Sequence, residues 1–169
     1  MTKTDRKGSA KFTVVSDTAY EVVRQFDAPA DLIYRAHTEP ELVKRWWGFP
    51  TSEWQECTVD PRVGGRWRFS VKEQDFDVSF HGRFTEIARP NRIVQTEIYE
   101  GMPGVTPDTE EGGTLNTAVI TEQDGVTTLH VHVECYSPEI LKAIFDSGME
   151  SGAQVSYDRM EELAHQLAA

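Results

Sequence analysis

The 169-residue sequence lacks the features that would tie it to a membrane or to a nucleic acid. No apolar run approaches the ~18 residues that a membrane span requires, and residues 1–10 have no apolar core of the kind found in signal peptides. The formal net charge is −11, so nucleic acids and anionic membrane surfaces would repel the protein. The nearest approach to a basic patch is Arg62, Arg66 and Arg68. We therefore expect a cytoplasmic protein whose partners include neither nucleic acid nor membrane.

Cysteine is also scarce, and its spacing excludes the common structural metal sites. Cys57 and Cys135 stand alone in strand-like segments, with no C-x-x-C motif and no Cys/His cluster at zinc spacing. Isolated thiols are typical of a reducing compartment. We expect two buried free thiols, no metal and no cofactor.

Catalytic signatures are missing as well. No Ser-His-Asp order, Cys-His pairing or phosphate-binding loop is recognisable, and Gly64-Gly65 belongs to a turn and not to a G-x-G-x-x-G motif. The sequence thus names no reaction, and binding is favoured over catalysis.

Most of the sequence consists of alternating apolar and polar residues, which is typical of strands with one buried face. Turn signals separate these segments at Asp60–Gly65 and at Gln123-Asp124-Gly125. Strands are predicted over residues 12–15, 20–26, 54–59, 66–71, 76–84, 93–99, 115–121 and 126–135.

Three helices are predicted around these strands. The first begins near Pro29, where a missing N–H costs nothing. The second follows Thr38-Glu39-Pro40-Glu41, which fits a capping box. Ser137-Pro138-Glu139 is a helix start, and apolar residues at spacings of three and four then predict one long helix from Pro138 to Leu167.

Several short motifs, taken as a set, resemble one protein family. They are Phe26-Asp27-Ala28-Pro29, Thr38-Glu39-Pro40-Glu41-Leu42, Trp46-Trp47-Gly48, Val59-Asp60-Pro61-Arg62-Val63-Gly64-Gly65, His81-Gly82, Pro90-Asn91 and Tyr157-Asp158-Arg159-Met160. From about Tyr20 to its C-terminus, the sequence resembles the bacterial homologues of the activator of heat-shock protein 90 ATPase. That family lies within the START-like (SRPBCC) superfamily.

The resemblance implies an α+β helix-grip fold. In this fold a curved antiparallel sheet wraps around a long C-terminal helix, with two short helices after the first strand, and encloses an apolar cavity. We expect a single START-like domain over residues 11–169 after a disordered tail over residues 1–10. Superfamily relatives bind lipids, sterols, polyketides and plant hormones, and some are cyclases.

The leading hypothesis is therefore that a small hydrophobic or aromatic ligand binds in a cavity between the sheet and the last helix. Trp46 and Trp47 would form a wall near the entrance, and the loop at residues 100–113 would be a mobile rim. Large apolar side chains and a helical glycine would line the interior, namely Phe69, Val78, Phe80, Phe145, Met149 and Gly152.

One departure from the family bears on the size of that cavity. Family members often carry a tryptophan directly after the second glycine of the last helix, whereas Gly152 is followed here by Ala153. The loss of an indole would enlarge the cavity or move its mouth.

Two other functions stay open. Glu97 would be a buried general base if its face of the strand points inward, which would make the protein a cyclase- or hydrolase-like enzyme. The alternation around Glu97 does not decide this, because Val94, Thr96 and Ile98 on the other face are also apolar or small. The third hypothesis is a co-chaperone whose partner is a chaperone ATPase domain, as the family resemblance implies.

The strand at 126–135 offers the one arrangement that could be taken for a metal site. His130, His132 and Glu134 alternate along it and could bind zinc or iron. The same alternation puts Leu129, Val131 and Val133 on the buried face, so we expect the polar set, like His81, to face solvent.

Overall fold

The computed structural model describes residues 5–101 and 113–168. Within these residues eight strands form one antiparallel sheet in the order β1-β2-β8-β7-β6-β5-β4-β3. The strands are β1 (Lys11–Val14), β2 (Ala19–Phe26), β3 (Glu53–Val59), β4 (Arg66–Lys72), β5 (Asp77–Ala88), β6 (Arg92–Tyr99), β7 (Thr114–Gln123) and β8 (Val126–Cys135).

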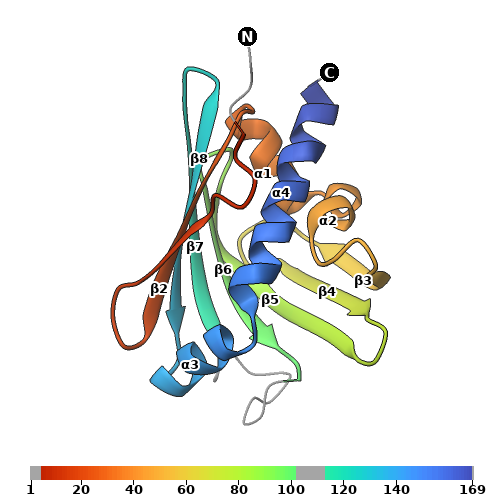
Figure 1. Ribbon diagram of the computed structural model, residues 1–169, viewed down its shortest axis with the longest axis vertical. Helices are drawn as coiled ribbons and strands as arrows, with labels where there is room; N and C mark the ends of the chain where they lie inside the picture. Colours follow the sequence, from red (N-terminus) through yellow and green to blue (C-terminus); the bar gives the residue numbers. More distant parts are fainter. Residues whose placement is uncertain (1–4, 102–112, 169) are drawn as a thin grey trace.

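Four helices accompany the sheet in the described ranges. They are α1 (Ala30–Thr38), α2 (Pro40–Trp46), α3 (Pro138–Asp146) and α4 (Met149–Ala168). Figure 1 shows the sheet curving around α4, with α1 and α2 beside the C-terminal half of that helix. This arrangement confirms the predicted α+β helix-grip fold. No helix of the described residues is long and apolar enough to cross a membrane.

The tight connection between β7 and β8 follows directly from its sequence. Gln123 pairs with Val126, so only Asp124 and Gly125 form the turn. Both have positive φ, +52° and +80°, which is the backbone of the two-residue turns that match the twist of a hairpin. The predicted hairpin is confirmed, and it aligns β7 with β8 residue by residue.

The predicted long C-terminal helix is interrupted. Ser137 caps α3 by accepting a hydrogen bond from the Ile140 backbone N–H, as expected. α3 ends at Asp146, because Gly148 then takes a left-handed backbone with φ +82°, a conformation that glycine adopts without strain. The chain therefore turns before Met149 starts α4, so the single predicted helix is wrong.

The predicted capping box is also wrong. Thr38 is the last residue of α1, and its hydroxyl donates to the Tyr34 carbonyl oxygen at 3.0 Å. Glu39 occupies the N-cap of α2 without a side-chain cap hydrogen bond. Only Glu39 separates α1 from α2, and the Thr38 hydroxyl bonds within α1 instead of capping α2.

Residues 5–10, within the predicted disordered tail, lie against α4. The backbone N–H of Gly8 donates to the Asp158 carboxylate at 3.0 Å. Gln154 pairs with both backbone polar groups of Ala10, at 3.0 Å and 2.7 Å. These contacts hold residues 8–10 against the N-terminal half of α4.

The main core lies between the sheet, α1, α2 and the C-terminal half of α4. Phe26, Ile120 and Met160 have no exposed surface, and burial of such side chains contributes roughly 1.5–3 kcal/mol each. A second, smaller cluster joins Tyr20, Val22, Val133, Cys135 and Leu141 near α3.

Candidate functional site

The inner face of the sheet changes character along β6. Ile93 and Ala118, paired across β6 and β7, belong to the main core under α4. Successive side chains of a strand alternate between faces, so Gln95 and Glu97 share the inner face with Ile93. Their partners on β7 are Asn116 and Thr114. A polar strip therefore occupies the inner face beyond Ile93, made of Gln95, Glu97, Thr114 and Asn116.

A filled core would bury the inner face of β6 more completely than its outer face, but the opposite is observed. On the outer face Val94, Thr96 and Ile98 are buried, the last at 1% exposure. On the inner face Gln95, Glu97 and Tyr99 are only half-buried. The outer face is covered in part by Gly113, where a Cβ would come within 2.5 Å of the Ile98 side chain.

A group of aromatic rings borders this strip on one side. The Trp47 ring contacts Phe69 and Phe80, with centroids 5.4 Å and 5.6 Å away. Phe80 stacks on Tyr99 at 5.0 Å. Trp47, Phe80 and Tyr99 all keep some exposed surface, while Phe69 is buried.

Trp46, predicted to lie beside Trp47 at the entrance, instead belongs to the core. Its indole N–H donates to the Ala36 carbonyl oxygen at 2.7 Å, and its ring stacks on Tyr157 at 6.5 Å. Only 7% of the residue is exposed. The two neighbouring tryptophans separate because α2 ends between them, with Trp47 at its C-cap.

The remaining predicted lining residues lie in different places. Val78 lies at the start of β5, where it pairs with buried Val71 of β4. Phe145 and Met149 pack against the second cluster. A Cβ at Gly152 would meet the Phe49 ring at 3.7 Å, so this glycine faces the loop after α2.

Two side chains that were not among the predicted lining residues join the clusters. Val131 on β8 and Tyr157 on α4 each pack against both the main and the second cluster. Both are half-buried. The helical spacing of three from Tyr157 to buried Met160 was a usable signal for an inward position.

Glu97 is the carboxylate of this inner face. Burial raises its pKa from 4.5 to about 6, although a hydrogen bond from the Asn116 amide acts in the opposite direction. Tyr20, Cys135 and Tyr157 are close enough that the charge on Glu97 adds to the effect of burial on them. Burial is the larger cause in each case, and the pKa of Tyr157 rises to about 12.

The outer face of β2 and β8 carries the two histidines. The Glu21 carboxylate bridges them, with one oxygen 3.0 Å from His130 Nε2 and the other 2.8 Å from His132 Nδ1. His130 and His132 are partly exposed, which confirms their predicted outward direction, and so is Glu21. No group of three or more His, Cys, Asp and Glu in the described ranges has an arrangement that could hold a metal ion.

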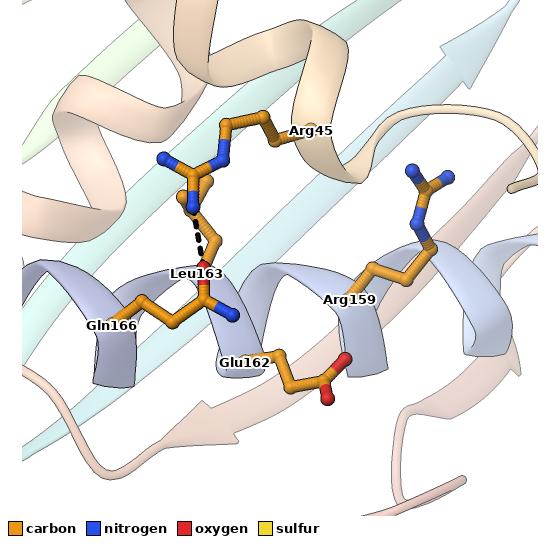
Figure 2. A pocket seen from close by; sticks show the side chains of 5 residues that line it. All are labelled: Arg45, Arg159, Glu162, Leu163 and Gln166. Carbon is orange, nitrogen blue, oxygen red and sulfur yellow. Dashed lines mark hydrogen bonds between the residues drawn. The ribbon is translucent and has the colours of Figure 1, made fainter.

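Two hollows open elsewhere on the surface. Figure 2 shows the smaller, about 70 Å³, where Arg45 of α2 reaches Gln166 of α4 beside Arg159 and Glu162. Small-molecule sites usually enclose at least ~300 Å³, so this hollow is too small. The larger, about 350 Å³, is lined mainly by β3, β4 and β5. Its residues are Glu56, Thr58, Arg66, Trp67, Arg68, His81, Gly82 and Glu100.

The larger hollow is dominated by charges that already have partners. Arg68 donates to Glu56 at 2.8 Å and to both Glu100 carboxylate oxygens at 2.9 Å. His81 lies 3.0 Å from the same Glu100 carboxylate. These four charged groups of the hollow are therefore already paired with one another.

Comparison with known proteins identifies the family. The model of the family described as "Activator of Hsp90 ATPase homolog 1-like protein" matches residues 27–165. The chain belongs to this family. No curated protein matches the sequence significantly.

Solved structures share the fold of this family member. A Rhodobacter sphaeroides protein is 24% identical, with a TM-score of 0.81 over 93% of this chain and 99% of that one. Ms6760 from Mycobacterium smegmatis is 22% identical, with a TM-score of 0.76 over 90% and 96%. PFC0360w, an HSP90 activator from Plasmodium falciparum, is 19% identical, with a TM-score of 0.52 over 70% and 73%. At these identities the likeness concerns the fold alone.

Proposed function

We propose that this family member binds a small apolar or aromatic ligand between the sheet and α4, over the polar strip of β6 and β7. The observation that carries the proposal is the reversed burial on β6. Inner-face side chains that face α4 stay half-buried, while the outer face of the same strand is covered.

The composition of this region supports a binding site over a packing interface. Gln95, Glu97 and Asn116 share the inner face of the sheet, and burial of such groups without full pairing costs free energy. Apolar and aromatic side chains lie around them. Val133 pairs with Asn116, and Tyr20 and Tyr157 lie close enough for the charge on Glu97 to raise their pKa. Ligand pockets typically combine a mostly apolar wall with a few polar groups that fix orientation.

The N-terminal half of α4 offers room on its inner side. Ala153 is half-buried and lies one helical turn before Tyr157, on the same face. Its methyl group stands where the resemblance described above places an indole in many family members. The smaller side chain leaves more room on this face of α4.

Replacement of Ala153 by tryptophan tests the proposal. We expect Ala153→Trp to fill the site and to weaken binding of the neutral fluorescent probe N-phenyl-1-naphthylamine at least about tenfold, since a pocket must be empty to hold a ligand. Ser151→Trp is the matched control, because it adds the same indole to the exposed side of α4. Native mass spectrometry of freshly purified protein would identify any ligand carried along.

The outcome is read from the two variants together. Equal probe binding by Ala153→Trp and the wild type would overturn the proposal. Loss of binding in Ser151→Trp as well would assign the probe to the surface of α4 and would also overturn it.

A chaperone ATPase domain is the second candidate partner. The family is named for activation of such an ATPase, and one structural neighbour is described as an HSP90 activator. Stimulation of a chaperone's ATP hydrolysis by the purified protein, unaffected by Ala153→Trp, would favour this function over ligand binding.

Catalysis by Glu97 is the remaining alternative. A general base works best with a pKa near the operating pH, and the pKa of Glu97 at about 6 lies in that range. Turnover that follows a pH profile with this pKa and disappears in Glu97→Gln would support an enzyme.

A further inference from the structure

We propose that the ligand of this site is an amphipathic amine, whose ammonium group pairs with the Glu97 carboxylate while its apolar part lies against the neighbouring apolar and aromatic side chains. This inference rests on the proposed function and adds the chemical class of the ligand. It follows from the partners that Glu97 has and from those that it lacks.

The hydrogen-bond capacity of Glu97 is only partly used. An ionised carboxylate offers about four acceptor positions, and the Asn116 amide is the donor whose effect is seen on Glu97. Thr114 lies directly opposite on β7, and its hydroxyl donates a hydrogen bond to the side-chain carbonyl oxygen of Asn116 at 2.7 Å, so it does not donate to Glu97. The strip therefore presents unused acceptor positions towards α4.

No cation of the described residues compensates this carboxylate. Arg24 is the inward-facing cation on β2, and it is committed to Asp158 and Glu161, each at 3.0 Å. Elsewhere in residues 5–101 and 113–168, the ion pairs formed by arginine, lysine and histidine use other acidic residues and leave Glu97 without one. An ammonium group brought by a ligand would supply the missing charge.

The surroundings of Glu97 also suit a cation. Tyr99 follows two residues later on the same face and stacks on Phe80. Tyr157 on α4 and Tyr20 on β2 also lie near Glu97. The Tyr20 ring packs edge-on against Phe145 at 5.1 Å. Aromatic faces attract ammonium groups, whereas a carboxylate ligand would meet Glu97 with a charge of the same sign.

The titratable groups that face Glu97 remain neutral around neutral pH. They are Tyr20 on β2, Cys135 on β8 and Tyr157 on α4, and burial raises the pKa of each. Glu97 is then the group of this inner face whose charge changes between pH 5 and pH 7.5. An amine should bind more tightly as the pH rises through that range, because Glu97 becomes fully ionised.

Three probes with the same tail separate the head group from the tail. Dodecylamine, dodecanol and dodecanoate would each be titrated into the full chain below their aggregation limits, with displacement of N-phenyl-1-naphthylamine as the readout. We expect the amine to bind at least about tenfold more tightly than the alcohol at pH 7.5, and dodecanoate to bind most weakly. The preference for the amine should shrink at pH 5, while the affinity for the alcohol stays constant.

Glu97→Gln is the decisive variant, since it keeps the shape of the side chain and removes its charge. We expect it to bind dodecylamine and dodecanol equally. Glu86→Gln is the matched control, because it removes one negative charge from the exposed outer face of β5. It should retain the preference, which separates pairing with Glu97 from attraction of a cation to an acidic protein. The pH series on the wild type tests the same point without any variant.

The outcomes distinguish the two proposals. Equal affinity for amine and alcohol in the wild type, or a preference that survives Glu97→Gln, would overturn the amine assignment. If the alcohol still competes with the probe and Ala153→Trp still blocks it, the binding site stands without its cationic ligand. If no dodecyl probe displaces the dye and Ala153→Trp has no effect, both proposals fail.

Discussion

The two halves of α4 face the same sheet but differ in how deeply their side chains are buried. In the C-terminal half, Met160, Leu163 and Ala164 are buried at 2% exposure or less against the main core. In the N-terminal half, Met149, Ala153 and Tyr157 keep exposed surface. The C-terminal half of this helix thus stabilises the fold, while its N-terminal half keeps exposed surface.

The sheet shows the same division along its strands. Ile120 on β7 and Leu129 on β8 are fully buried beneath the C-terminal half. Four residues before Ile120 on the same face, Asn116 is half-buried and polar. Burial of apolar area stabilises the folded state in proportion to that area. The stability of the fold therefore depends mainly on the end of the sheet beneath the C-terminal half of α4.

The largest expected effect comes from equal truncations at the two ends. Met160→Ala should destabilise the protein by about 2–5 kcal/mol, because Met160 is fully buried. Met149→Ala, the same chemical change on the half-buried end, should cost less than about 1 kcal/mol. Urea unfolding of both variants measures the difference, and equal losses would contradict the division of α4.

Removal of the Glu97 charge should increase the stability of the protein, by less than Met160→Ala decreases it. The pKa of Glu97 rises on folding from 4.5 to about 6, so the unfolded chain loses this proton at lower pH than the folded protein does. Ionisation of Glu97 therefore destabilises the fold as pH rises from about 4.5 to above 6, by up to about 2 kcal/mol.

Glu97→Gln should consequently be more stable than the wild type by up to about 2 kcal/mol at pH 8 and equal to it at pH 4. Thermal unfolding at both pH values, with Glu86→Gln as the exposed control, measures this. A variant less stable than the wild type at pH 8 would show that ionised Glu97 supports the fold.

The smallest effect is expected for the acidic residue on the outer face. Hydrogen bonds from His132 and His130 lower the pKa of Glu21, and Glu21 in turn raises the pKa of His132. Glu21→Gln should return the pKa of His132 towards 6.5, as followed by NMR titration, with Glu53→Gln as an exposed control. The stability from this pair is present below pH 6.5 and is lost as pH rises through the raised pKa of His132. It should be small, because exposed ion pairs contribute little. An unchanged His132 titration would contradict the pairing.

Local chemistry made much of the fold predictable. Alternation located the strands, and the pairing of positive φ with Asp124-Gly125 follows from turn preferences that act within four residues. The proline at the start of α3 and its Ser137 cap are equally local. Errors arose where a short signal served two neighbours, as at Thr38, which satisfies α1 instead of capping α2.

The candidate site was less predictable, because its members are brought together by strand register. Glu97 was ambiguous from its own strand, and its inward direction is fixed by pairing with Thr114 and by Ile93 reaching the core. Tyr157 and Cys135 approach Glu97 from α4 and β8, although both are far from it in the sequence. Trp46 and Trp47, adjacent in the sequence, separate into core and site because α2 ends between them.

The strands, the turn between β7 and β8 and the start of α3 could be predicted from the sequence, because alternation and turn chemistry act over a few residues. The break between α3 and α4 was not predicted. Only the tertiary structure decided that the inner face of β6 is half-buried and polar while its outer face is covered. Burial depends on which segments distant in the sequence pack over each face, and the pKa of Glu97 follows from that packing.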